Sequence, residues 1–197
     1  MIDLAAIYAR HALDFDRVRT RSLMELPYLE QVTRLVPPPG KVLDVGCGSG
    51  EPIARYFVER GYQVTGIDFV EPMLAMCRSR FPGMTWRSMD MRQLDLAEVF
   101  EVVVAWDSFF HLAPEEQRAV LPRFSRHTGP GGVLMFTSGT TEGGAVGGDL
   151  CGERLYHGSL SKEEYADRLD RAGFDVVLHR VQDPACGGHT VWIARRR

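Results

Sequence analysis

The stretch Val42-Leu43-Asp44-Val45-Gly46-Cys47-Gly48-Ser49-Gly50 decides the fold of this chain. It begins as an apolar, β-branched strand, continues into three glycines at alternate positions, and then enters a helical segment. Glycine at such a turn permits positive φ angles and lets backbone amides come close to a ligand. The stretch therefore predicts a strand–loop–helix unit with a ligand at the loop. A plain glycine turn is the alternative interpretation.

Outward from this unit, strand-like and helix-like segments alternate along the chain. We expect strands at 41–45, 63–67, 84–88, 102–106 and 132–136, and helices between them at 52–60, 71–80 and 114–124. Such alternation is typical of a parallel sheet covered by helices on both faces. A capped helix from Ser161 and two strands at 174–180 and 190–194 complete the chain, and the turn-rich loop between these strands makes the last one antiparallel. The prediction is a three-layer α/β fold with about seven strands.

Two segments lie outside this alternating core. The first 36 residues have helical character, with one helix from an Asp3 cap to about His11 and another over 22–36 before a run of prolines. Residues 138–160 follow the fifth strand, and six glycines fall within 138–152. A glycine-rich connection of this length predicts a flexible loop, and such loops usually serve function.

Composition narrows the classes of protein that fit. The chain has 197 residues with 45% hydrophobic and 25% charged residues, which suits a single globular domain. A formal net charge of −3 argues against a protein that grips phosphate backbones, so we expect no nucleic-acid partner. No apolar run is long enough to span a membrane, and no secretory leader is evident. The four cysteines lack the spacing of a metal site, so we expect free thiols in a reducing cytoplasm.

Carboxylates follow two further strands of the predicted sheet. Asp68 ends the second strand, 22 residues after Gly46, where a carboxylate can accept both hydroxyls of a ribose. Asp90 follows the third strand, where it can accept the exocyclic amine of adenine while Met91 lies against the ring. Each aspartate alone could equally be a helix cap or a solvated loop residue. Because these strand ends share one sheet edge with the glycine loop, together they predict an adenosine ligand.

The loop does not match the two common nucleotide-binding fingerprints. Glu51 stands where the dinucleotide motif needs its third glycine, and no lysine followed by serine or threonine makes a P-loop. Asp44 would place a negative charge near a pyrophosphate, whereas it suits a ligand with a positive end, such as a sulfonium or an ammonium. These features count against a nicotinamide-dependent oxidoreductase, which remains the less favoured alternative.

Five segments of the chain resemble the motifs of a known family. The segments that carry it are V-L-D-V-G-C-G-S-G at 42–50, V-T-G-I-D at 64–68, the Asp90 loop, E-V-V-V-A-W-D-S-F-F-H-L at 101–112 and G-P-G-G-V-L-M-F at 129–136. They resemble the motifs of class I S-adenosylmethionine-dependent methyltransferases of the small-molecule type. The resemblance implies a Rossmann-like fold, S-adenosyl-L-methionine as cofactor and S-adenosyl-L-homocysteine as product.

The resemblance also implies two groups of cofactor contacts. Around the methionine part it implies Asp44, Gly46, Cys47, Gly48, Gly50, Trp106 and Asp107, with Asp44 near the ammonium. Around the ribose and adenine it implies Asp68, Phe69, Met73, Asp90 and Met91. Tyr8 or Arg17 could reach the cofactor carboxylate from the N-terminal segment, which resembles the lid of small-molecule members. A solvated amphipathic helix is the alternative for that segment.

Methyl transfer from a sulfonium is an in-line displacement, so the enzyme mainly aligns the nucleophile and excludes water. A hydroxyl acceptor needs a base, whereas a neutral amine may need none. The candidate catalytic residues are His111, Tyr156 and His157. A structural role is the alternative for His111, and the sequence does not fix the depth of His189. We expect no metal, because Thr137-Ser138 offers no second acid beside Asp107.

The resulting interpretation is one domain over residues 1–197. It comprises a helical lid (1–36), a cofactor-binding core (41–137), a flexible loop and substrate lid (138–160) and a C-terminal helix and hairpin (161–197). We expect a cytoplasmic, metal-independent methyltransferase, monomeric or homodimeric, that acts on a small-molecule acceptor, with oxygen slightly favoured over nitrogen. A non-catalytic module that binds S-adenosylmethionine is the main alternative.

Overall fold

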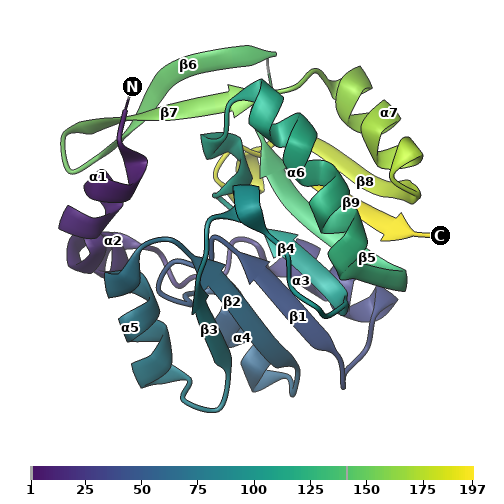
Figure 1. Cartoon of the computed structure of the whole chain (residues 1–197), viewed down its shortest axis with the longest axis horizontal. Coiled ribbons are helices and arrows are strands. Elements are labelled where there is room, and N and C mark those ends of the chain that lie inside the picture. Colours follow the sequence, from purple (N-terminus) through teal and green to yellow (C-terminus); the bar gives the residue numbers. More distant parts are fainter. Residues whose placement is uncertain (1, 141) are drawn as a thin grey trace.

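A seven-stranded sheet forms the centre of the computed structural model, which describes residues 2–140 and 142–197 (Figure 1). Residues 1 and 141, which fall in the expected lid and the expected loop, lie outside the described residues. The strand order is β3-β2-β1-β4-β5-β9-β8. The strands are β1 (Lys41–Val45), β2 (Gln63–Asp68), β3 (Thr85–Ser88), β4 (Phe100–Ala105), β5 (Thr128–Ser138), β8 (Phe174–Asp183) and β9 (His189–Arg196).

The pairing of these strands confirms the predicted fold class. The strands β1 to β5 are mutually parallel where they pair, with Val42 opposite Val64 on one side and Val102 on the other. The last strand β9 runs antiparallel to both β5 and β8. The carboxyl ends of β1 to β5 therefore meet at one edge of the sheet, and the antiparallel strand β9 begins at that same edge.

Helices cover both faces of the sheet, which gives three layers. One face packs against α3 (Leu26–Leu35), α4 (Ile53–Glu59) and α5 (Glu71–Arg80), and the other against α6 (Pro114–His127) and α7 (Lys162–Arg171). Along β4 the side chains alternate between the two cores, Val102 and Val104 toward one and Val103 and Ala105 toward the other. A strand buried on both faces explains why this segment is almost entirely apolar.

The N-terminal segment differs from the prediction in detail. Asp3 caps α1 (Leu4–Arg10) as expected, but a further helix α2 (Ala12–Val18) follows directly. The helix expected over 22–36 begins only at Leu26, since Pro27 occupies its first turn and Leu23 adopts a positive φ of 53°. Ala12 of α2 is buried against Val70 and Met73, so tertiary packing stabilises a helix that the sequence pattern did not reveal.

The flexible loop expected over 138–160 is instead an antiparallel hairpin of β6 (Gly143–Leu150) and β7 (Glu153–Ser159). Its two-residue turn is Cys151-Gly152, with φ angles of 53° and 86° that suit a tight hairpin. Glycine is a poor strand former, so the pattern hid the strand. Leu150 and Leu155 of the hairpin pack against Ile7 of α1, and Figure 1 shows the hairpin reaching across to α1.

The remaining regular structure consists of three short 3-10 turns. They span Met91–Gln93, Phe109–His111 and Pro184–Cys186. No helix among the described residues combines the length and the apolar character needed to cross a bilayer.

Candidate active site

A cavity of about 1170 Å³ lies at the edge of the sheet where the parallel strands end. Its walls come from the loops after β1, β2, β3 and β4, and it is covered by the helices α1 and α2 together with the β6–β7 hairpin. Open parallel sheets bind their ligands at this edge, near the point where the strand order reverses, which here lies between β1 and β4.

The glycine loop after β1 forms a tight turn beneath the cavity. Gly46 and Gly48 line it, both with positive φ. The amides of Gly46 and Cys47 donate to the carbonyl of Ile67 at 2.8 and 3.1 Å, so they are engaged within the fold. A Cβ atom on Gly46 would lie 2.3 Å from the Cβ of Ser108, which makes glycine necessary there.

Two expected residues of this loop do not line the cavity. The buried thiol of Cys47 lies toward the carbonyl of Gly48, and Gly50 lies against Phe81 and Cys77. Their contribution is therefore to the shape of the loop.

Asp68 lies at the end of β2 and faces the cavity. Its two carboxylate oxygens accept the backbone N–H groups of Gly48 and Val70, each at 2.9 Å. Burial raises its pKa, and those backbone hydrogen bonds act in the opposite direction. Each oxygen retains a lone pair, so the carboxylate can still accept hydrogen bonds from paired hydroxyls. Phe69 and Met73, the other residues expected here, also line the cavity.

The loop after β3 supplies Asp90 and Met91, which both line the cavity as expected. The side chain of Asp90 accepts from the backbone N–H of Arg92 and from its guanidinium, both at 2.8 Å. Burial opposes ionisation of Asp90, but the hydrogen bonds from Arg92 outweigh it and lower its pKa. Arg92 in turn pairs with Glu116 at 2.9 Å, so this corner of the cavity is a fixed network of charges.

Asp44 is a buried carboxylate behind the glycine loop and does not itself line the cavity. Burial, followed by the charge of Asp68, raises its pKa to about 7, while Arg19 acts in the opposite direction. A carboxylate held in this environment gains from any cation that approaches it.

In the loop after β4, the consecutive residues Trp106 and Asp107 lie in different environments. Asp107 lines the cavity, whereas Trp106 packs beneath it, with its ring 5.3 Å from that of His189 and 6.2 Å from that of Tyr28. The buried indole N–H of Trp106 has no hydrogen-bond partner among the residues that the structure describes. The ring of Trp106 thus turns into the core and does not line the cavity, although the resemblance implied this residue around the methionine part.

Asp107 is bound by two residues that the sequence did not assign to the site. His189 Nε2 lies 2.7 Å from one carboxylate oxygen, and Arg19 donates to the other at 3.2 Å. The hydrogen bond to Asp107 is the main cause that raises the pKa of His189. The signal for His189 was available: an antiparallel last strand must begin at the edge where the parallel strands end. Arg17, in contrast, is exposed and pairs with Asp14 at 3.3 Å on its own helix.

The candidate catalytic residues form a cluster under the hairpin. His111 and Tyr156 line the cavity, whereas His157 stands behind them with its ring centroid 5.1 Å from that of His111. His111 Nδ1 lies 3.0 Å from the carbonyl oxygen of Tyr156, which fixes the proton on Nδ1. Nε2 therefore carries the lone pair and accepts from the hydroxyl of Tyr8 at 3.0 Å. Burial lowers the pKa of His111 to about 4, so the ring is neutral at physiological pH.

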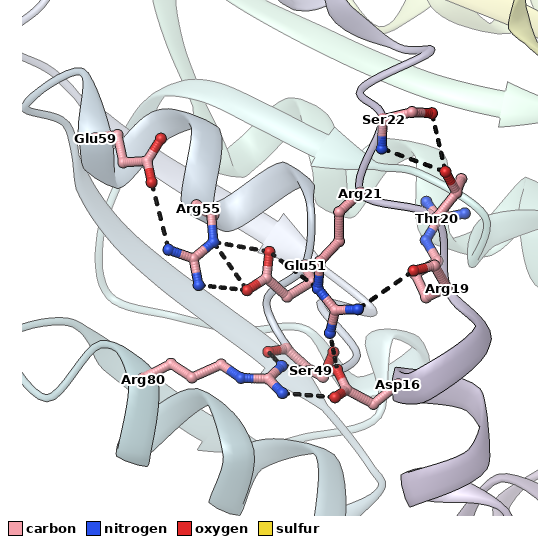
Figure 2. A network of polar contacts seen from close by, with 10 residues as sticks. All are labelled: Asp16, Arg19, Thr20, Arg21, Ser22, Ser49, Glu51, Arg55, Glu59 and Arg80. Atoms are coloured by element: carbon pink, nitrogen blue, oxygen red, sulfur yellow. Dashed lines mark hydrogen bonds and ion pairs between the residues drawn. The ribbon is translucent and has the colours of Figure 1, made fainter.

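A polar network attaches α2 to the glycine loop (Figure 2). Arg80 of α5 forms two hydrogen bonds with Asp16 of α2, at 2.7 and 2.5 Å, and donates to the carbonyl of Ser49 at 3.1 Å. Hydrogen bonding to Arg80 is the main cause that lowers the pKa of Asp16 to about 2. Arg21 joins Asp16 at 3.2 Å, so the covering helix is held to the loop that it covers.

Among known proteins, residues 42–132 match the model of a family described as "Methyltransferase domain". A curated relative from Streptomyces venezuelae, dTDP-3-amino-3,4,6-trideoxy-alpha-D-glucopyranose N,N-dimethyltransferase, is 33% identical over 131 residues, which cover 65% of this chain and 49% of the relative. The chain spans between 38% and 62% of the length of the first four curated relatives that it matches.

Two solved structures resemble the whole chain. The first is CalS10, an amino pentose methyltransferase from Micromonospora echinaspora with bound S-adenosylmethionine; the TM-score is 0.75 at 21% identity, over 100% of this chain and 98% of that one. The second is 1,6-didemethyltoxoflavin-N1-methyltransferase from Burkholderia thailandensis; the TM-score is 0.76 at 24% identity, over 98% and 87% of the two chains. These similarities confirm the fold.

Proposed function

Because this chain carries a methyltransferase domain over residues 42–132, we propose that it transfers a methyl group from S-adenosylmethionine to a small-molecule acceptor. The observation that carries the proposal is the position of Asp68. Its carboxylate faces the cavity, is fixed by two backbone N–H groups of adjoining loops, and lies next to the glycines of the turn. The similarity of the fold to methyltransferases supports the same conclusion.

The residues of the cavity fit this cofactor. Asp68 would hold the ribose hydroxyls, while Met91, Met73 and Phe69 offer soft and aromatic surfaces for the adenine. Gly46 and Gly48 leave open the space that a side chain would fill beneath the methionine part. The cofactor supplies a methyl group bonded to a sulfonium, which is a good leaving group. The protein then has to bind and align the acceptor and to exclude water.

His111 and Tyr8 would position the acceptor. The lone pair on His111 Nε2 faces the Tyr8 hydroxyl at the cavity wall, so an acceptor that displaces this hydroxyl finds a hydrogen-bond acceptor already oriented by the Tyr156 carbonyl. The hairpin residues Tyr156 and Val146 close the cavity on that side. An acceptor space bounded by both covering segments supports an enzyme over a module that only binds the cofactor.

The transfer is proposed to be independent of metal. Asp107, the acid at the end of β4, is already bound to Arg19 and His189, which leaves it poorly suited as a metal ligand. The donor groups His11, Asp14 and Cys151, which do lie within 4.8 Å of one another, belong to the covering segments. They contribute nothing to the wall near His111.

The first test is calorimetric titration of the protein with S-adenosylmethionine and S-adenosylhomocysteine, with NAD as a control. We expect micromolar affinity for the first two and none for NAD. Asp68→Ala should weaken both affinities at least tenfold, since a charge-assisted contact contributes roughly 1.5–3 kcal/mol. Asp167→Ala on α7, an exposed carboxylate in an i,i+4 pair with Arg171, is the matched control and should change nothing. Binding of NAD alone, or an unchanged affinity in Asp68→Ala, would refute the proposal.

A further inference from the structure

Carboxylates greatly outnumber cations on the wall of the cavity. Among the described residues, five acidic side chains and one guanidinium line it: Asp3, Asp68, Asp90, Asp107 and Glu116 against Arg92. The imidazole of His111 is neutral and adds no positive charge. Its Nδ1–H donates a hydrogen bond to the carbonyl of Tyr156, and its Nε2 accepts one from the hydroxyl of Tyr8. These lining side chains carry an excess of four formal negative charges, although the chain as a whole carries only −3. With Asp68 and Asp90 assigned to the cofactor, Asp3, Asp107 and Glu116 remain for the acceptor.

The cations near this wall are already paired. Arg92 contacts Asp90 at 2.5 Å and Glu116 at 2.9 Å, so two carboxylates share its charge. Arg19 lies behind Asp107, its side chain is only 14% exposed, and it pairs with both Asp107 and Glu25 at 3.2 and 3.1 Å. Among the described residues that line the cavity, none offers an unpaired positive charge. A phosphate or carboxylate on the acceptor would therefore be desolvated without a partner.

This charge distribution distinguishes two kinds of acceptor. A phenolate, alkoxide or carboxylate would bring a negative charge against carboxylates. A neutral amine brings none, and the positive charge that begins on the sulfonium ends on the new ammonium, within the same acidic wall. The acidic wall thus stabilises the positive charge both on the sulfonium before the transfer and on the ammonium after it. His111 agrees with this, since a neutral imidazole whose pKa burial lowers is a poor base for a hydroxyl.

Building on the proposed function, we infer that the acceptor is a small amine that carries neither phosphate nor carboxylate. The amine enters as its ammonium form, drawn by the acidic wall, and releases one proton to solvent. Its nitrogen lone pair then forms the bond to the methyl carbon while the carbon–sulfur bond breaks and its electron pair stays on sulfur. The methylated ammonium and the neutral thioether leave. This sets the chain apart from the relative whose name carries a thymidine diphosphate group.

The inference is tested with four probes that share one ring: 4-fluorobenzylamine, 4-fluorobenzyl alcohol, 4-fluorobenzoate and 4-fluorophenyl phosphate. Each is titrated by fluorine NMR into protein saturated with S-adenosylhomocysteine, at low and at high salt. We expect the amine to bind about tenfold more tightly than the benzoate or the phosphate at low salt, and this preference to shrink as salt screens the wall. Methyl transfer from S-adenosylmethionine is measured for the same four compounds.

A charge-neutralised variant links the preference to the wall. Asp3 and Glu116 each accept a backbone N–H, from Ala6 and Ala113, and Asp3→Asn/Glu116→Gln keeps those acceptors while removing two charges. This double variant should lose most of the preference for the amine. The control, Glu163→Gln/Asp167→Asn on α7, removes two exposed charges outside the cavity and should keep it.

Equal or tighter binding of the phosphate or the benzoate would overturn the inference. Equal binding of all four probes, or no binding of any of them, would also overturn it. The same holds if Asp3→Asn/Glu116→Gln keeps the full preference for the amine. Failure of the proposed function is seen separately, as loss of binding of S-adenosylhomocysteine itself before any probe is added.

Discussion

The hydroxyl of Tyr8 and Nε2 of His111, 103 residues apart in the sequence, meet at 3.0 Å across the cavity. Tyr8 belongs to the first helix and His111 to the turn after β4, so this hydrogen bond joins the covering segment to the sheet edge. The carbonyl of Tyr156 fixes the other ring nitrogen at 3.0 Å. The imidazole of His111 is thus hydrogen-bonded to both covering segments, α1 and the β6–β7 hairpin.

Removing the Tyr8 hydroxyl should raise the pKa of His111 from its value of about 4. The hydroxyl donates to Nε2 and so stabilises the neutral ring, and one such hydrogen bond corresponds to roughly one pKa unit. An NMR titration of the histidine ring signals in Tyr8→Phe measures the change. Tyr156→Phe is the control, because Tyr156 contacts the ring through its backbone carbonyl and should leave the pKa in place.

His111→Ala should lower turnover at least tenfold while the affinity for S-adenosylhomocysteine changes by less than twofold. His111 lines the cavity, and on the proposed function its imidazole would orient the nucleophile of the acceptor. Turnover is measured with 4-fluorobenzylamine as the acceptor, and the affinity for S-adenosylhomocysteine is measured by calorimetry. His157→Ala should cost less, since His157 stands behind His111. Equal turnover in His111→Ala and the parent would leave His111 only a structural role.

Asp44→Asn should stabilise the free protein at alkaline pH and weaken cofactor binding. The pKa of Asp44 is about 7 in the fold against 3.8 for the unfolded chain, so the folded state holds a proton that the unfolded state releases. The parent protein therefore loses stability as pH rises from about 4 to 7, by as much as ~4 kcal/mol. Urea unfolding at pH 5 and pH 8 should show the variant gaining most at pH 8. A gain that is the same at both values would contradict this.

Breaking the pair between Asp16 and Arg80 should speed release of S-adenosylhomocysteine several-fold. The pair holds α2 onto the glycine loop through two hydrogen bonds, at 2.7 and 2.5 Å. Because its pKa is lowered to about 2, Asp16 contributes stability that is present above pH 4 and disappears as pH falls toward 2. Stopped-flow release from Asp16→Asn measures the effect. Asp14→Asn, on the same helix but paired with exposed Arg17, should behave as the parent.

Gly46→Ala should destabilise the protein and abolish cofactor binding. Gly46 has a φ of +73°, and a methyl group there would lie 2.3 Å from the Cβ of Ser108. Gly61→Ala isolates the backbone cost, because Gly61 has a φ of +84° and open space around it. We expect about 1–2 kcal/mol for Gly61→Ala and clearly more for Gly46→Ala in urea unfolding. Equal losses would show that Ser108 simply moves aside.

Much of the site could be inferred from local sequence because its residues directly follow strands. Asp68, Asp90 and Asp107 each come at or just after the end of a strand, and parallel strands bring such positions to one edge. Alternation of apolar segments was therefore enough to predict the fold and to bring Asp68 and Asp90 to this edge, whereas Phe69, Met73 and Asp107 were implied by the resemblance to a known family. The same logic was not carried to His189, whose strand runs the other way and so begins at that edge.

The covering segments were predicted less well. The hairpin β6–β7 is rich in glycine, and the strand register that pairs Val146 with Tyr156 is set by the other strand and by packing on α1. The helix α2 owes its place to burial of Ala12 and to the ion pair with Arg80. These elements are defined by partners distant in the chain, which a local pattern does not contain.

The sequence by itself determined the α/β sheet and the glycine turn, and it placed Asp68 and Asp90 at one edge of the sheet, because each depends on hydrophobic periodicity or on residues adjacent in the chain. Only the tertiary structure decided how the cavity is closed and charged. It brought Tyr8 to His111, bound Asp107 between Arg19 and His189, and turned Trp106 into the core. Side chains from separate elements must meet before their burial and pairing fix a protonation state, and that meeting depends on the whole fold.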